Sequence, residues 1–174
     1  SFLNEVDIKH HTNGNRIYYL AVAPEFFEVI VDNLAKTNLN KHEGKFTRVM
    51  IEKPFGRNLQ SAIYLNQKII EVFGEENTYR IDHYLGKEML QNIMVIRFAN
   101  SLFEPVWNKD YIEQIQITAS ETIGVGSRGN YYENAGAIRD MVQSHLLQLL
   151  SLIAMERPKD LSPNSVRDEK VKVL

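Results

Sequence analysis

One short stretch, residues 80–88, gathers side chains that could together bind and transform a phosphorylated, hydroxylated substrate. It holds a carboxylate at Asp82, an imidazole at His83, a phenol at Tyr84 and an ammonium at Lys87, with one glycine that can form a turn. Such groups can serve proton transfer and phosphate binding. A strand end, a turn and a capped helix with ordinary surface charges would give the same composition, so the flanking elements have to decide.

A second candidate, His145, lies far downstream on a long helix that we predict over about 134–155. At about 100° per residue, His145 shares a stripe with apolar side chains and faces the core. A hydrogen-bonded core histidine is the simplest interpretation, but a general base also needs a group that titrates near neutral pH. Asp82 or Asp140 could orient it. In a regular helix Asp140 points about 140° away from His145, so Asp82, from another element, is the better partner.

The residues before 80–88 predict parallel α/β architecture. Continuous apolar runs indicate buried strands, and apolar residues at helical spacing indicate helices. In chain order we expect a strand over 16–22, a helix from Pro24, a strand over 46–51 and a helix over 59–73. Such a sheet binds ligands at the C-terminal ends of its strands. Lys53 and Pro54 follow the second strand there, where the lysine could reach a phosphate or a hydroxyl, although a structural Lys-Pro turn is the simpler alternative.

After Tyr79 the pattern changes to that of a second, α+β domain. Besides the long helix, we expect a helix over 87–98, a short helix or turn over 101–107 and a half-buried strand of an antiparallel sheet over 112–119. The predicted fold class is therefore α/β followed by α+β. The predicted domains are residues 1–81 and 82–174, and the first fifteen residues are expected to be irregular.

The composition excludes several classes of protein. Of the 174 residues, 44% are hydrophobic and 24% are charged, which suits a soluble protein with a buried core. A formal net charge of -2 argues against a general nucleic-acid binder. The absence of cysteine removes disulfides, thiolate metal sites and a cysteine nucleophile, and fits the cytoplasm. We expect no metal. We also expect no membrane span, because no apolar run approaches the roughly 20 residues that a span requires, and no signal peptide, because residues 1–5 lack a basic segment followed by an apolar one.

The glycines of residues 124–129 match G-x-G-x-x-G, a pattern found in dinucleotide-binding turns. That function needs a second parallel strand after the helix and an acid at its end, about 20 residues beyond the glycines. Here the helix is expected to run on to about Met155 with no strand after it. We therefore predict a flexible turn rather than a coenzyme site.

Six segments together resemble the glucose-6-phosphate dehydrogenase family, in order and at the family's spacing. They are residues 52–56, 80–88, 92–100, 107–110, 138–148 and 166–174. Each motif alone is moderately specific, and their combination covers most of the chain. The resemblance implies oxidation of β-D-glucose 6-phosphate at C1 to the 6-phospho-lactone, the first step of the oxidative pentose phosphate pathway, with hydride transfer to NADP; NAD is not excluded.

The resemblance also assigns roles to the chemical groups. His145 matches the base that takes the proton of the C1 hydroxyl, and Asp82 matches the carboxylate that orients this base. The family's phosphate cluster corresponds to His83, Tyr84 and Lys87. General-base catalysis of this kind contributes roughly 10²–10⁴-fold.

Four further residues match family contacts with the sugar and the coenzyme. Lys53 corresponds to a residue that touches both, and Pro54 to one that helps position the nicotinamide. Glu121 and Asp140 correspond to carboxylates that bind sugar hydroxyls. For Asp140 this assignment conflicts with the regular-helix geometry, unless the helix begins near Asp140 or is irregular there.

Some of the family pattern is different or missing. Ser144 stands where Asn is common, and Ala23 where Pro is frequent. Because the glycine-rich phosphate turn and the residue that selects NADP are absent, no starting Met is present and a predicted helix over 165–174 is in mid-run, we expect a fragment. It would hold the C-terminal half of a Rossmann-like domain and the start of a mixed or antiparallel sheet-plus-helix domain. We expect no activity from the fragment alone, and a homo-oligomer (a dimer or tetramer) at full length.

Two alternatives remain open. Another Rossmann-type sugar dehydrogenase could share the Glu-Lys-Pro turn of residues 52–54, although such enzymes lack the 80–88 run. A sugar-phosphate-binding sensor could keep the fold without catalysis. A sensor needs neither a base nor its orienting acid, so the joint presence of His145 and Asp82 argues against it.

Overall fold

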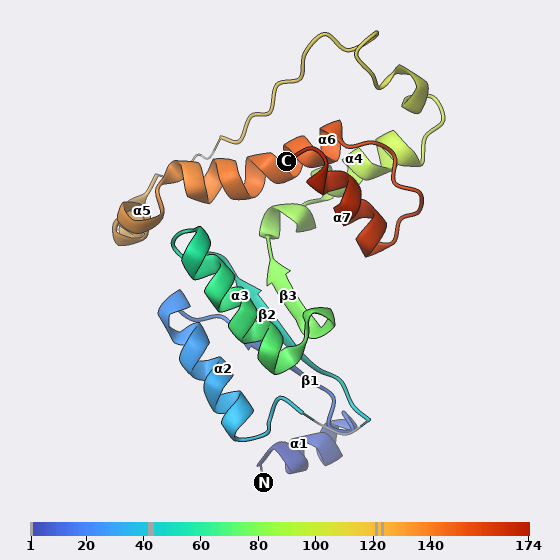
Figure 1. The fold of residues 1–174 in the computed structure, drawn as a ribbon. Coiled ribbons are helices and arrows are strands. Elements are labelled where there is room, and N and C mark those ends of the chain that lie inside the picture. Colours follow the sequence, from blue (N-terminus) through green and yellow to red (C-terminus); the bar gives the residue numbers. More distant parts are fainter. Residues whose placement is uncertain (1, 42–43, 121, 123) are drawn as a thin grey trace. The chain divides into compact units, whose positions relative to one another are not determined.

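Two separately packed units make up the chain in this computed structural model, residues 1–81 and 82–174 (Figure 1). The structure describes residues 2–41, 44–120, 122 and 124–174, and each unit is considered by itself. None of the described helices is both long and apolar enough to cross a membrane.

The first unit is built on a parallel sheet in the order β1-β2-β3. Its strands are β1 (Arg16–Leu20), β2 (Thr47–Glu52) and β3 (Thr78–Ile81), and its main helices are α2 (Phe27–Lys36) and α3 (Leu59–Phe73). A 3₁₀ turn precedes α2 at Pro24–Phe26, and another precedes β3 at Glu75–Asn77. The two helices lie side by side on one face of the sheet (Figure 1). This arrangement agrees with the predicted alternation of strands and helices.

One face of the sheet carries the core of the first unit. Along β2 the side chains alternate, so that Val49 and Ile51 are fully buried beneath the helices. Ile17 and Tyr19 of β1 point the other way and are more than half exposed. The prediction of a buried strand is therefore wrong for one face of β1. Among the described residues, α2 and α3 both cover one face of the sheet and leave the other face exposed.

Local signals explain both ends of α3. Helix α3 begins with a capping box between Asn58 and Ser61 and ends before Gly74, whose φ of 78° suits glycine. Residues 1–15 were expected to be irregular, but Phe2–His10 forms α1. This helix buries no side chain, so it has no apolar stripe to reveal it, and an ion pair of 2.7 Å between Asp7 and Arg16 ties it to β1.

The second unit is helical in the described residues. Its elements are the 3₁₀ helices His83–Gly86, Glu104–Val106 and Gly126–Arg128, the helices α4 (Glu88–Phe98), α5 (Gly129–Ala135), α6 (Leu147–Ala154) and α7 (Pro163–Val171), and the π-helix Ile138–Leu146. The core contains Tyr84, Leu90, Phe98, Leu149, Leu152 and Met155. The predicted helix over 134–155 is thus three elements, because Gly136, with φ of 74°, ends α5.

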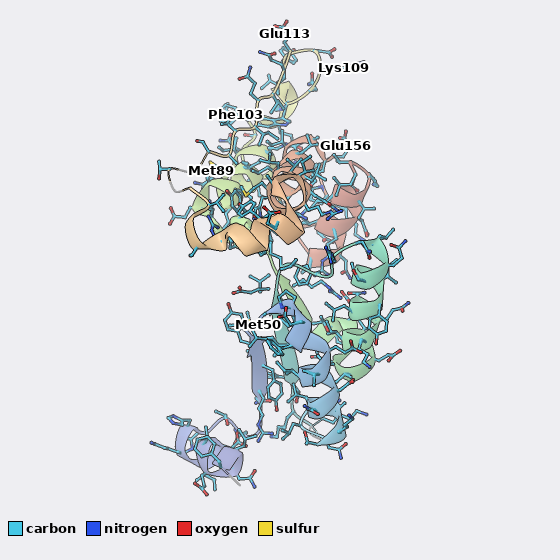
Figure 2. The ribbon with its side chains drawn as sticks, turned by 90° about the vertical axis from the view of Figure 1, so that its left-hand side faces the viewer. Met50, Met89, Phe103, Lys109, Glu113 and Glu156 are labelled. Carbon is cyan, nitrogen blue, oxygen red and sulfur yellow. The ribbon has the colours of Figure 1, made fainter. Side chains whose placement is uncertain are left out.

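The strand predicted over residues 112–119 is wrong for this unit. The segment has no strand partner, and Glu113 near its start lies at the far end of a loop that projects from the helices of this unit (Figure 2). Some of its apolar side chains still reach the core: Ile117 and Ala119 pack against it, while Ile115 is half exposed. A strand also needs a neighbour for its backbone hydrogen bonds, and the described residues of this unit provide none.

A buried arginine holds the end of α6. The guanidinium of Arg97 donates to the carbonyl oxygens of Leu152 (2.7 Å) and Met155 (2.8 Å). The indole of Trp107 donates to the carbonyl of Ile153 at 2.9 Å. Burial lowers the pKa of Arg97. These bonds satisfy carbonyls at a helix end that has no further turn to pair with them.

We predict that Arg97→Met destabilises the protein by about 2–4 kcal/mol, because it leaves two carbonyls without their charged donor. Arg97→Lys should cost less, since an ammonium can still reach one carbonyl. The measurement is urea unfolding, with the exposed Arg167→Met as the matched control. Equal midpoints for Arg97→Met and the control would contradict this role.

Candidate active site

A part-buried hydrogen bond joins His145 to Asp82, two residues far apart in the sequence. The distance from His145 Nδ1 to Asp82 Oδ1 is 2.7 Å, and the histidine is fully buried. Asp82 directly follows β3 and caps the 3₁₀ helix His83–Gly86, where its Oδ1 also accepts from the backbone N–H of Tyr84 at 2.9 Å. When the carboxylate accepts from Nδ1–H, the imidazole is held in the tautomer that leaves Nε2 as a base.

The π-helix resolves the geometry of Asp140. In a helix with i→i+5 hydrogen bonds, residues five apart lie about one turn apart. Asp140 and His145 are five apart, and both are buried, with exposures of 7% and 0%. The exception stated for Asp140 therefore applies: the helix begins near Asp140 and is irregular there, so the separation of about 140° in a regular α-helix does not hold. π-helical turns occur frequently at functional sites.

Tyr84 packs its ring against the imidazole of His145. The two rings are stacked, with centroids 4.0 Å apart and planes inclined by 14°. The ammonium of Lys87 lies 3.7 Å from the centroid of the same tyrosine ring. The ring of His83 meets His145 edge-on at 4.7 Å. An aromatic face stabilises a neighbouring cation, so Tyr84 can both fix the imidazole and favour its protonated form.

Two neighbouring groups of the site were not anticipated from the sequence. The first is Lys170 of α7, whose ammonium hydrogen-bonds to Gln148, one turn after His145. Burial lowers the pKa of Lys170, and the charge of Asp82 acts in the opposite direction. Lys170 lies within the family-like segment 166–174, which was the only signal in the sequence.

The second unanticipated group is Tyr131 of α5. Its hydroxyl donates to Asp140 Oδ1 at 2.7 Å. Burial, followed by the hydrogen bond and charge of Asp140, raises the pKa of Tyr131 well above its usual value. The phenol is therefore a neutral donor across the physiological pH range. No sequence pattern links residues 131 and 140, because Gly136 and the π-helix create their proximity.

The other predicted site residues are distributed as follows. His83, Tyr84 and Lys87 lie with Asp82 and His145 in the second unit. Lys53 and Pro54 belong to the first unit, where they follow β2 and are joined by a cis peptide bond. Glu121 lies outside the described residues.

One trio could also hold a metal ion, contrary to our expectation of no metal. Asp82, His83 and His145 each offer a ligand atom, and these atoms lie within 4.8 Å of one another. In the structure Asp82 and His145 are joined directly by their hydrogen bond. A carboxylate–imidazole bond is what a general base needs, and it accounts for the closeness of Asp82 and His145.

The glycines of residues 124–129 lack the context of a dinucleotide site in the part of the chain that the structure describes. No described strand leads directly into them, and they form a 3₁₀ turn, Gly126–Arg128, and the start of α5. Gly126 adopts a φ of 52°. This geometry agrees with the predicted turn.

Family models match nearly the whole chain. Residues 1–92 match the family model of the glucose-6-phosphate dehydrogenase NAD binding domain, and residues 94–174 match that of the glucose-6-phosphate dehydrogenase C-terminal domain. These matches cover both units. The chain therefore belongs to the glucose-6-phosphate dehydrogenase family.

Individual relatives support this assignment. The chain is 54% identical over 173 residues to the glucose-6-phosphate 1-dehydrogenase of Treponema pallidum, covering 99% of this chain and 34% of the relative. It is 52% identical to the Bacillus subtilis protein of that name, covering 99% of this chain and 35% of the relative. The chain thus spans about a third of the length of these relatives.

Solved structures give the same result. A glucose-6-phosphate dehydrogenase in complex with its substrate glucose-6-phosphate has a TM-score of 0.87 at 42% identity, over 99% of this chain and 35% of that chain. The glucose-6-phosphate 1-dehydrogenase of Mycobacterium avium has a TM-score of 0.80 at 42% identity, over 90% of this chain and 34% of that chain.

Proposed function

We propose that this chain supplies the catalytic pair and the phosphate-binding side chains of an NADP-dependent glucose-6-phosphate dehydrogenase. The reaction is oxidation of β-D-glucose 6-phosphate at C1 to 6-phosphogluconolactone, with NAD as the alternative coenzyme. The observation that carries the proposal is the 2.7 Å bond between His145 Nδ1 and Asp82 Oδ1 in a buried setting. A solved relative described as a complex with glucose-6-phosphate supports the substrate.

Proton transfer is the task of the histidine–carboxylate pair. His145 Nε2 takes the proton of the C1 hydroxyl as C1 loses its hydride, and Asp82 stabilises the resulting imidazolium through Nδ1–H. When bound, the nicotinamide coenzyme supplies the hydride acceptor. The stacked ring of Tyr84 stabilises the same positive charge.

Substrate binding falls to groups around this pair. His83 and Lys87 are exposed and can meet a phosphate, with the Lys87 ammonium held over the ring of Tyr84. The hydroxyl of Tyr84 is a further phosphate donor. Asp140 accepts from a sugar hydroxyl, and Glu121 is proposed to do the same.

The coenzyme fits the first unit in one respect. Its strands are parallel, so their C-terminal ends share an edge, and Lys53 and Pro54 follow β2 at that edge. Lys53 would contact coenzyme and substrate, and Pro54 would help to position the nicotinamide. We propose no metal, because proton and hydride transfer account for the reaction.

The two units correspond to parts of a larger enzyme in this proposal. Residues 1–81 form the second half of the coenzyme domain, and residues 82–174 begin the domain for substrate binding and oligomerisation. We propose a cytoplasmic homo-oligomer, either a dimer or a tetramer, whose activity requires more than these 174 residues.

We predict that His145→Asn, in a full-length enzyme carrying this chain, lowers kcat roughly 10²–10⁴-fold while glucose 6-phosphate binding changes little. Asp82→Asn should also lower kcat, because an amide cannot favour the correct tautomer in the same way. The measurements are coenzyme reduction and calorimetric substrate binding, with the exposed His10→Asn as the control. A sensor would instead be supported if the parent protein binds glucose 6-phosphate without reducing the coenzyme and His145→Asn leaves that binding unchanged.

A second prediction concerns the aromatic ring beside the base. Tyr84→Leu removes the face that stabilises the imidazolium, so the acid limb of the kcat/KM profile should move to lower pH by roughly 0.4–1 unit. Tyr84→Phe keeps the ring and should keep the profile, even if it raises KM through loss of a phosphate contact. The measurement is coenzyme reduction from pH 5 to 9. Identical shifts in the two variants would rule out the ring as the cause.

A further inference from the structure

A carboxylate as buried as Asp140 needs partners, because a charge away from water is costly unless it is hydrogen-bonded. Tyr131 provides one of them, donating from its hydroxyl to Asp140 Oδ1 at 2.7 Å. The residue comes from α5, a separate helix on the far side of Gly136. The contact is therefore tertiary and depends on how the chain turns between the two helices.

The backbone fixes this turn in several places. The N–H of Gly136 bonds to the carbonyl of Tyr132 at 2.8 Å, and the N–H of Asp140 bonds to the carbonyl of Gly136 at 3.0 Å. The hydroxyl of Ser144 donates to the carbonyl of Asp140 at 2.7 Å. With φ of 74° at position 136, a residue with a side chain would be strained there. The start of the π-helix is thus held against α5.

The phenol suits this position chemically. Its raised pKa keeps it protonated, so it remains a donor wherever the enzyme operates. Tyr132 meets its ring edge-on, with centroids 5.6 Å apart and planes at 89°, which restricts the rotation of the ring. A rigid neutral donor fixes the plane of a carboxylate without competing for its charge.

We propose that Tyr131 is a positioning residue that sets the direction in which Asp140 accepts a hydrogen bond from a sugar hydroxyl. The inference rests on the proposed function of Asp140. With Oδ1 fixed by the phenol, the carboxylate is preorganised for its hydroxyl partner and loses less freedom when the sugar binds. Recognition of that hydroxyl thereby depends on a residue that does not itself contact the sugar.

The test uses steady-state kinetics of the full-length enzyme with glucose 6-phosphate. Tyr131→Phe should raise KM about 5–10-fold, which corresponds to one neutral or charge-assisted hydrogen bond, with kcat within about twofold of the parent. Tyr132→Phe removes the adjacent hydroxyl and keeps its ring, and should leave KM unchanged. An unchanged KM in Tyr131→Phe would overturn the inference.

A double-mutant cycle separates positioning from general destabilisation. Asp140→Asn should raise KM more than Tyr131→Phe, and the double variant should be no worse than Asp140→Asn alone. Monodeoxy analogues of glucose 6-phosphate add a second readout, because the analogue that lacks the hydroxyl bound by Asp140 should be insensitive to both substitutions.

Two results would contradict positioning and indicate a structural role. In one, the KM increases of Tyr131→Phe and Asp140→Asn add independently in the double variant. In the other, Tyr131→Phe raises KM equally for every monodeoxy analogue, including the one that lacks the hydroxyl bound by Asp140. If Asp140→Asn itself leaves KM unchanged while His145→Asn still abolishes turnover, the role of Asp140 fails and the proposed dehydrogenase activity stands. If Asp140→Asn lowers the melting temperature, the analogue series with Tyr131→Phe alone still decides between the outcomes.

Discussion

The second unit depends on the hydrogen bond between the buried imidazole of His145 and the carboxylate of Asp82. A buried polar side chain is costly without a partner, and the loss of either group would leave the other unsatisfied. The bond joins the turn after β3 to the last turn of the π-helix, more than sixty residues away in the sequence. It therefore contributes to the packing of this unit and also defines the tautomer that the proposed chemistry requires.

The π-helix is the second constraint. Its wider turns bring Asp140 and His145 to the same side, where a regular helix would separate them. The surrounding groups then follow from short-range contacts: Tyr84 stacks on the imidazole, and Tyr131 bonds to Asp140. One helical segment thus carries both the buried carboxylate and the buried imidazole to which we assign substrate binding and proton transfer.

The sequence allowed the repetitive parts of the fold to be predicted. Helix α3 has the predicted bounds, because its apolar spacing, its cap at Asn58 and its end at Gly74 agree. The choice of Asp82 over Asp140 as the neighbour of His145 also agrees with the structure, although it was reached by assuming a regular helix. Helix α1 was missed because it buries nothing, and the strand over 112–119 was wrong because alternation alone cannot supply a pairing partner.

The contacts that depend on irregular backbone could not be predicted from the sequence. Periodicity assumes regular elements, so the sequence raises irregularity near Asp140 only as a condition and predicts neither the π-helix nor the break at Gly136. The Tyr131–Asp140 contact follows from both. The roles of the site residues came from the resemblance to the family, and the geometry adds a physical reason for several of them.

In the proposed mechanism His145 faces the C1 hydroxyl of glucose 6-phosphate while Asp82 holds the other ring nitrogen of His145. A crystal structure of the full-length His145→Asn enzyme with glucose 6-phosphate and oxidised coenzyme tests it most directly, because the inactive variant retains the substrate. We predict that, when the parent histidine is superposed on position 145, the C1 hydroxyl oxygen lies about 2.6–3.2 Å from its Nε2. A substrate whose C1 lies far from position 145, with another base within hydrogen-bond distance of the hydroxyl, would contradict the role of His145 as the base.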